Sequence, residues 1–474
     1  MHESQPAMSA SLPSMVRAPV VERASWALYD FANTIFSMNV ATLYFSVWLI
    51  NDLGASSTVY ALGNGISSLL VVLSVPIFGA LSDARRRRKP WVVGFTIAAC
   101  LACAMIGVLG QRTLPIVGEG TLGGALAIGW QPTIGAFGPV LVAFIVANYC
   151  YQAAQPFYNA MLPELVPPEE RGRLSGVGTA VGYVGTIVGL LLVVPFFNGA
   201  FPLIGDIPES ILATLRSIVP FTANAGRVST FVPTAMLFFL FSLPLFFFCR
   251  DRYPRAGRVD WRRAFANVAH TLRDARDHKG ALPFIIASFL YQDAIGTIVS
   301  FMALYAVKAM GFARGAETTL FLVLTIPAIA GSYAAGRLVD RFGAKRTLVV
   351  SIVSWIVLLI AMILVPSQGA FWVVGLFIGL IFGAVPTAER PLLLSLVPEA
   401  EAGRFFSLLL LSSRAAAITG PLIWGLTVDG LEPISGTGVA YRAAVISVIL
   451  MFAASLLLMR YVPDRRRATG SGVS

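Results

Sequence analysis

Long apolar runs, separated by short polar segments, dominate the sequence. Twelve of these runs are about 20 residues or longer, which is the length that an α-helix needs to cross the ~30 Å hydrocarbon core of a bilayer. They cover residues 24–50, 57–81, 91–110, 135–162, 174–197, 231–249, 282–309, 316–339, 347–366, 370–396, 405–427 and 441–462. Because the runs are continuously apolar rather than alternating, they predict membrane-spanning helices and not the strands of a β-barrel.

The composition indicates that lipid is the main solvent of this chain. Of its 474 residues, 57% are hydrophobic and only 12% are charged. Soluble domains carry about 25% charged residues, and disordered chains are poor in apolar residues, so both classes are excluded. The four cysteines lie in apolar runs without a neighbouring histidine, so neither a disulfide framework nor a metal site is predicted.

Basic residues are distributed unequally between the two sets of loops. With the N-terminus placed in the cytoplasm, 27 of the 35 Lys and Arg residues fall on the cytoplasmic side and six on the other side. Cytoplasmic loops carry the excess of Lys and Arg. We therefore expect a multi-pass protein of a bacterial cytoplasmic membrane with both termini inside. The same bias accounts for the net charge of +11 without a nucleic-acid partner.

The two halves of the sequence resemble each other. Three local matches pair Gly79–Asp83 with Gly336–Asp340, Leu165–Arg173 with Leu396–Arg404, and Leu28–Ser37 with Leu290–Ser300. Each match links spans that are six apart, which indicates two parallel six-helix repeats.

The predicted organisation has five parts. They are a cytoplasmic tail (1–22), a six-helix bundle (23–249), a cytoplasmic linker (250–281), a second six-helix bundle (282–462) and a second cytoplasmic tail (463–474). In the linker, Trp261, Phe265, Val268 and Leu272 share one helical face, which predicts an amphipathic helix on the inner leaflet. An ordinary soluble linker helix is the alternative.

The loops after the second and eighth spans resemble the signature loop of the major facilitator superfamily. Asp340–Arg346 follows Gly336 in the family pattern, and the earlier copy, Gly79–Lys89, has Arg86 where the family has glycine. More narrowly, Trp26–Asn33 and Phe157–Glu164 are similar to motifs of the vacuole-effluxer-like subgroup, whose vacuolar members export amino acids.

The resemblance implies the fold and the mode of action. It implies an all-α membrane protein with twelve transmembrane helices in two pseudo-symmetric six-helix bundles, which transports by alternating access. It also implies a cytoplasmic gate at the signature loops. The residues that match this gate are Asp83, Arg87, Asp340, Arg341 and Lys345.

Ionisable side chains within the spans are candidates for a transport site, because a charge in hydrocarbon costs ~3 kcal/mol or more. Asp30 and Asp293 occupy corresponding positions in spans one and seven, and we expect both to face a shared cavity. A gate or capping role for Asp30 and a structural hydrogen bond for Asp293 are the alternatives. Glu389 and Arg390 are adjacent on span ten and point ~100° apart, so each needs a partner elsewhere. Arg414 either pairs with one of these carboxylates or binds a substrate carboxylate.

Polar side chains on three spans complete the candidate site. Asn148, Gln152 and Gln155 form one stripe on span four, which must face a cavity or another helix because polar groups are costly in lipid. Pro156 and Pro386 interrupt spans four and ten at matching places, which points to a transport site; kinks that serve only helix packing are the alternative. The further candidates are Asn33, Tyr158, Asn159 and Tyr291.

The function predicted from these residues is secondary active transport, and not an enzymatic activity. The three histidines lie outside the predicted spans, so Asp30, Asp293 or Glu389 would carry a coupled proton. No GxxxxGK[ST] motif occurs, which disfavours ATP-driven transport. We expect a monomer, surrounded by membrane lipids and without cofactor or metal, that moves a small polar metabolite; the resemblance favours an amino acid. A sugar or drug-like substrate and a lipid-handling protein are the alternatives.

Overall fold

The computed structural model describes most of the chain. The described residues are 17–53, 55, 57–85, 87–118, 134–201, 205–222, 226–252, 276, 278–312, 316–365 and 367–464. Most of the predicted linker, including its amphipathic helix, lies outside them, as do most of both tails.

The first half of the described chain is almost entirely helical. A continuous helical stretch with two π-helical parts covers the first predicted span, and a short antiparallel hairpin with a surface helix follows α8. The elements are α1 (Val20–Phe36), η1 (Ser37–Tyr44), α2 (Phe45–Val47), η2 (Trp48–Asp52), α3 (Ser57–Arg85), α4 (Lys89–Gly118), α6 (Ile134–Ala160), α7 (Leu162–Leu165), η3 (Pro168–Glu170), α8 (Arg171–Asn198), β1 (Ala200–Phe201), β2 (Gly205–Asp206), α9 (Glu209–Ile218), η4 (Arg227–Thr230) and α10 (Phe231–Phe248).

The second half consists of long helices joined by short connections. Its elements are α12 (Ala281–Met310), α13 (Ala316–Phe342), α14 (Ala344–Leu364), α15 (Gln368–Phe382), α16 (Ala384–Leu396), η5 (Glu399–Glu401), α17 (Ala402–Ser435), α18 (Thr437–Leu458) and η6 (Met459–Tyr461). Span ten is interrupted between α15 and α16, three residues before Pro386. Span four is not, because α6 continues through Pro156. Of the two predicted interruptions, the one in span ten is therefore present and the one in span four is absent.

Eight helical stretches among the described residues are long and apolar enough to cross a membrane. They are Lys89–Gln111, Pro168–Asn198, Arg227–Phe248, Ala281–Met302, Ala344–Leu364, Gln368–Leu396, Ala402–Ser435 and Thr437–Met459. Helices also cover the four remaining predicted spans, so the fold is consistent with the predicted twelve. The molecule is an all-α membrane protein, and large apolar side chains such as Leu364 and Leu426 are exposed on its outer surface.

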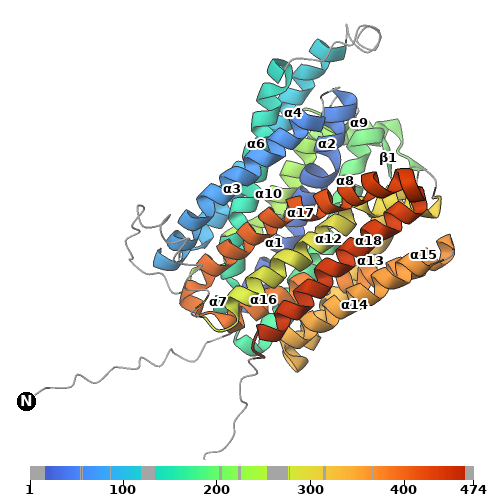
Figure 1. Cartoon of the computed structure of the whole chain (residues 1–474). Coiled ribbons are helices and arrows are strands. Elements are labelled where there is room, and N and C mark those ends of the chain that lie inside the picture. The colour runs from blue at the N-terminus through green and yellow to red at the C-terminus, as the bar shows by residue number, and fades with distance from the viewer. Residues whose placement is uncertain are drawn as a thin grey trace, which may run out of the picture.

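The long helices pack side by side into one bundle (Figure 1), in which the two halves of the chain are distinct. In the first half, α1 packs against α8 and α10, and α4 packs against α6. In the second half, α12 packs against α17 and α18, and α13 against α15. The halves meet mainly where α8 packs on α13 and α3 packs on α17.

Glycine allows α8 and α13 to approach closely. A Cβ added to Gly176 would lie 2.6 Å from the carbonyl oxygen of Ser332 and 2.8 Å from the Cα of Gly336. In lipid, the hydrophobic effect does not drive helices together. Small residues at such crossings allow the close van der Waals contact that stabilises the pair instead. This contact brings the two halves together near the loops that carry most of the basic residues.

The loops predicted to share one side of the membrane lie together at one end of the bundle, called here the basic end. Arg252 links the start of the linker to Glu22, with 3.1 Å between Nη2 and Oε2. Arg346, at the start of α14, lies 2.8 Å from Asp464 near the end of the described chain.

Candidate functional site

An ion pair joins the two halves close to the basic end. Nη1 of Arg390, on α16, lies 3.0 Å from Oδ2 of Asp30, on α1. The two side chains are only 14% and 7% exposed. The guanidinium also lies 5.7 Å from the ring centroid of Trp26 and 5.8 Å from that of Tyr158. The structure thus brings together three predicted site residues, Asp30, Tyr158 and Arg390.

The aromatic rings of Trp26 and Tyr158 lie beside this ion pair and contact each other. Their rings stack with centroids 4.7 Å apart. The indole Nε1 donates to the carbonyl of Tyr158 at 3.2 Å, and the Tyr158 hydroxyl donates to the carbonyl of Trp26 at 3.0 Å. These reciprocal bonds fix α1 against α6. Trp26 is not among the predicted site residues, although it opens the Trp26–Asn33 motif.

Glu389 is held by the neighbouring helix α12. Its carboxylate accepts a hydrogen bond from the Tyr291 hydroxyl and two from Nε2 of Gln292, at 2.8 and 3.0 Å. Glu389 and Arg390 therefore turn to different partners, in line with their ~100° separation on the helix. Gln292 is a further site residue that the sequence pattern does not single out, although it lies between Tyr291 and Asp293.

Asp293 connects α12 to α17. Its Oδ1 accepts the backbone N–H of Gly420 at 2.9 Å, which is the structural hydrogen bond given above as one alternative. Its Oδ2 is buried and has no hydrogen-bond partner among the described residues. The residue is 1% exposed. One carboxylate oxygen is thus used by the fold, and the other remains available for chemistry.

Arg414, on α17, forms no ion pair with any described residue. Pairing with Asp30, Asp293 or Glu389 is therefore not observed, and its Nε is buried without a hydrogen-bond partner. The neighbouring group that acts on it electrostatically is Tyr151 of α6, a residue that the sequence pattern does not single out. The residue as a whole is partly buried, and a guanidinium that is withdrawn from water without a counter-charge is costly and needs a compensating interaction.

One buried atom in each of four candidate amide side chains has no hydrogen-bond partner among the described residues. Leaving a buried polar atom unpaired costs ~1–3 kcal/mol, so each such atom calls for an explanation, of which a bound ligand or water is one. The atoms are Oδ1 of Asn33, Oε1 of Gln152, Nε2 of Gln155 and Oδ1 of Asn159.

Asn148 behaves differently from the rest of the polar stripe on α6. Its Nδ2 donates to Oδ1 of Asn64 at 3.1 Å and to Oγ of Ser67 at 2.7 Å. Both partners lie on α3, so Asn148 joins two helices of the same half. Of the three stripe residues, Asn148 therefore faces another helix.

The predicted gate residues lie at the basic end, where the halves are in contact. Oδ2 of Asp340 accepts the backbone N–H of Arg173, at the start of α8, at 2.9 Å. An ion pair between Arg171 and Glu399 also crosses between the halves. Arg87 and Arg341 are exposed and Lys345 is partly buried. The side chain of Asp83 lies outside the described residues.

The two bundles, the contact of the second signature loop with the start of α8 and the charged residues between the bundles define a membrane transporter of the major facilitator superfamily. The transporter FucP of this superfamily, solved in the outward conformation, has the same fold, with a TM-score of 0.66 at 13% identity over 93% of this chain and 97% of that one. The uncharacterized MFS-type transporter YxiO of Bacillus subtilis is 24% identical over 460 residues, covering 95% of this chain and 96% of the relative. The multidrug resistance protein MdtG of Rahnella sp. is 24% identical over 271 residues, 56% of this chain and 59% of the relative.

Within the superfamily, the chain belongs to the vacuole effluxer Atg22-like family, whose sequence profile matches residues 53–470. The match confirms the resemblance seen in the motifs. It begins after span one, so the Trp26–Asn33 motif lies before it.

Proposed function

We propose that this transporter moves a small polar metabolite with a carboxylate group, most simply an amino acid, by alternating access. Arg414 is the observation that carries the proposal. It is a permanent cation on α17, which packs against α3 and α6 of the other half, and it has no counter-charge among the described residues. A guanidinium binds a carboxylate through two parallel hydrogen bonds, so a carboxylate substrate would supply the missing charge.

The free oxygen of Asp293 supports an amino acid in particular. An amino acid carries an ammonium group beside its carboxylate, and Oδ2 of Asp293 has no partner among the described residues. Arg414 and Asp293 would then recognise the two ends of one zwitterion. The unpaired amides of Asn33, Gln152, Gln155 and Asn159 would complete its hydrogen bonds.

The alternating motion in this proposal is a rocking of two bodies, residues 23–249 and 282–462, joined by the linker 250–281. A single chain supplies every candidate residue, so a monomer suffices. The Asp30–Arg390 ion pair and the contact between Asp340 and Arg173 hold the basic end closed. Opening that end breaks both contacts and exposes the site to the cytoplasm, if both termini lie there.

Proton coupling forms part of the same proposal. Asp30, Asp293 and Glu389 are the buried carboxylates of the site. Asp30 is neutralised by Arg390, whereas neither Asp293 nor Glu389 forms an ion pair with a described residue. Glu389 instead accepts hydrogen bonds from neutral donors, Tyr291 and Gln292. Asp293 and Glu389 are therefore the better proton carriers, because protonation of either breaks no ion pair.

A drug-like compound is the second candidate substrate. The relative MdtG is named as a multidrug resistance protein, and Trp26 and Tyr158 present aromatic rings beside the Asp30–Arg390 pair. A cationic drug would not need Arg414, which separates the two candidates experimentally.

A ligand screen by thermal unfolding in detergent tests the proposal. Specific binding raises the apparent melting temperature through mass action. We expect one or more amino acids to stabilise the wild-type protein, and Arg414→Lys to lose this effect, since lysine keeps the charge but lacks the planar fork. Arg460→Gln, which removes an exposed cation at the basic end, is the control and should respond like the wild type. Stabilisation by drug-like cations alone, unchanged in Arg414→Lys, would overturn the proposal.

A further inference from the structure

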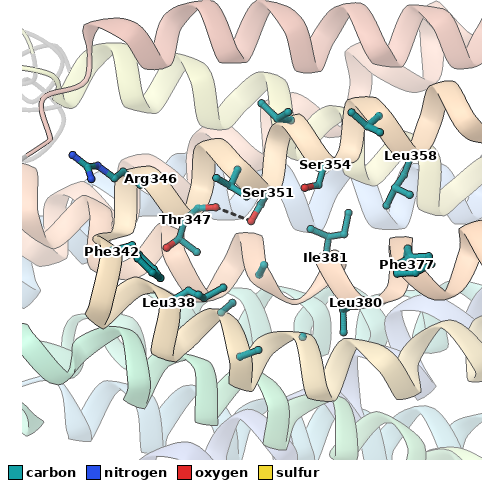
Figure 2. A pocket seen from close by; sticks show the side chains of 17 residues that line it. Leu338, Phe342, Arg346, Thr347, Ser351, Ser354, Leu358, Phe377, Leu380 and Ile381 are labelled. Atoms are coloured by element: carbon teal, nitrogen blue, oxygen red, sulfur yellow. Dashed lines mark hydrogen bonds between the residues drawn. The ribbon is translucent and has the colours of Figure 1, made fainter.

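An apolar groove of about 770 Å³ lies on the second half, between α13, α14 and the α15–α16 helix pair. Figure 2 shows it running along α14, with Arg346 at one end and Leu358 and Phe377 towards the other. It contains none of the candidate transport residues. Its lining includes Leu338, Phe342, Arg346, Val350, Val357 and Phe377.

The walls of the groove are apolar and exposed on the outer surface of the bundle. Val350, Val357 and Phe377 are 63%, 57% and 54% exposed. The hydroxyls of Thr347 and Ser351 each donate to the carbonyl four residues earlier, that of Gly343 and of Thr347, and so need no further acceptor. Such a surface suits a hydrocarbon chain and offers little to a water-soluble ligand.

Small residues of α13 make the groove deep. Gly331 and Ala334 form part of its lining, and a Cβ on Gly331 would collide with the backbone of Leu380 on α15. The close approach of α13 and α15 thus forms the floor, and the larger side chains of α14 form a wall. From Arg346 to Leu358 the helix rises ~18 Å, which is about half of the ~30 Å hydrocarbon core. The groove therefore has the length of one leaflet.

The basic end of the groove is cationic. Arg346 is 55% exposed at its mouth, and Arg337 and Arg341 are exposed on the adjacent α13. Asp464 lies 2.8 Å from Arg346 and is the carboxylate that pairs with it. Basic pockets between transmembrane helices near the membrane surface bind anionic lipid head groups.

We propose that this groove binds an anionic phospholipid, with one acyl chain along α14 and the phosphate at Arg346. Any apolar groove in a bilayer contacts acyl chains, so the acyl chain alone gives no selectivity. The cations at the mouth of this groove select lipids with an anionic head group. In the bound state the phosphate replaces Asp464 as the partner of Arg346. The proposal is independent of the transported substrate.

Lipid titration in detergent tests this site through the melting temperature. Phosphatidylglycerol should stabilise the wild-type protein at lower concentration than phosphatidylcholine with the same acyl chains. Arg346→Gln should raise the half-saturating concentration of phosphatidylglycerol about fivefold, which corresponds to the loss of one cation near the surface. It should leave the half-saturating concentration of phosphatidylcholine unchanged. Asp464→Asn should have the opposite effect, because it removes the competing carboxylate.

Two controls identify the groove as the site. Arg460→Gln removes an exposed cation at the same end that does not line the groove, and should leave the lipid preference intact. Ala334→Phe fills the groove from an exposed position and should abolish stabilisation by phosphatidylglycerol while the lipid-free melting temperature stays near that of the wild type. Equal stabilisation by both lipids, an equal loss in Arg460→Gln, or full stabilisation by glycerol phosphate without acyl chains would overturn the proposal.

Discussion

The ion pair between Asp30 and Arg390 should set how firmly the basic end stays closed. Each side chain is at least 86% buried, since the exposed fractions are 14% and 7%, so removing one partner leaves the other charge uncompensated. Breaking a buried pair in this way costs about 3–5 kcal/mol. Because Asp30 lies on α1 and Arg390 on α16, the cost falls on the state in which the halves meet. An equilibrium that favours closure should therefore shift towards opening by a factor of ~10² or more.

Spin labels at Glu169 and Arg460, which are exposed on opposite halves at the basic end, would report this shift as a distance distribution. We expect Arg390→Gln to add a population with a longer distance, and the double variant Asp30→Asn/Arg390→Gln to lose much of it, since no buried charge then remains unpaired.

The matched control is Arg88→Gln. Arg88 forms a similarly buried ion pair with Glu164 at 2.7 Å, with side chains 2% and 9% exposed, but both residues belong to the first half. Its loss should lower the melting temperature and leave the distance distribution unchanged. The reasoning would be refuted if Arg88→Gln opened the basic end as far as Arg390→Gln, or if Arg390→Gln only lowered the melting temperature.

Three further predictions follow from the candidate site and the loops. Asp293→Asn should weaken amino-acid counterflow, because the ammonium group loses its charged partner, and should remove the response of the remaining uptake to an imposed pH gradient; a response that persists would assign the coupled proton to another group. Gly420→Ala should destabilise the protein by ~1–3 kcal/mol, because its Cβ would lie 2.6 Å from Oδ1 of Asp293, and unaltered denaturation would contradict the close packing of α12 and α17. A fluorescent protein fused to the C-terminus should be bright and an alkaline phosphatase fusion inactive, as expected for a cytoplasmic end; the reverse pattern would invert the predicted topology.

The helices could be predicted because apolar length is a local property of the sequence. The hairpin β1–β2 and the π-helical part of the first span could not, since two-residue strands and helix irregularities leave no comparable periodicity. The surface helix α9 is amphipathic, but its 10 residues fall short of the length that marks a span. Eight spans meet the criteria of length and hydropathy among the described residues, while the predicted division into five parts remains a prediction.

The sequence identifies the charged residues of the site but does not show which of them contact each other. Asp30 and Arg390 stand out because ionised groups are rare in apolar runs, yet they are 360 residues apart, and only the packed bundle shows that they meet. The polar stripe on α6 could be placed away from lipid, but its pattern does not distinguish Asn148, which bonds to α3, from Gln152, whose Oε1 is unpaired in the described part of the chain. Gln292 and Tyr151 are uncharged and lie outside the polar stripe of Asn148, Gln152 and Gln155, so neither criterion selects them.

The central claim is that a substrate carboxylate occupies the place opposite Arg414. Counterflow in proteoliposomes, with radiolabelled amino acids outside and the same unlabelled compounds inside, measures it most directly. We predict accumulation of at least one amino acid by the wild type and by Arg460→Gln, and none by Arg414→Lys. Accumulation by Arg414→Lys at the wild-type rate, or of the decarboxylated amine in place of the amino acid, would contradict the account.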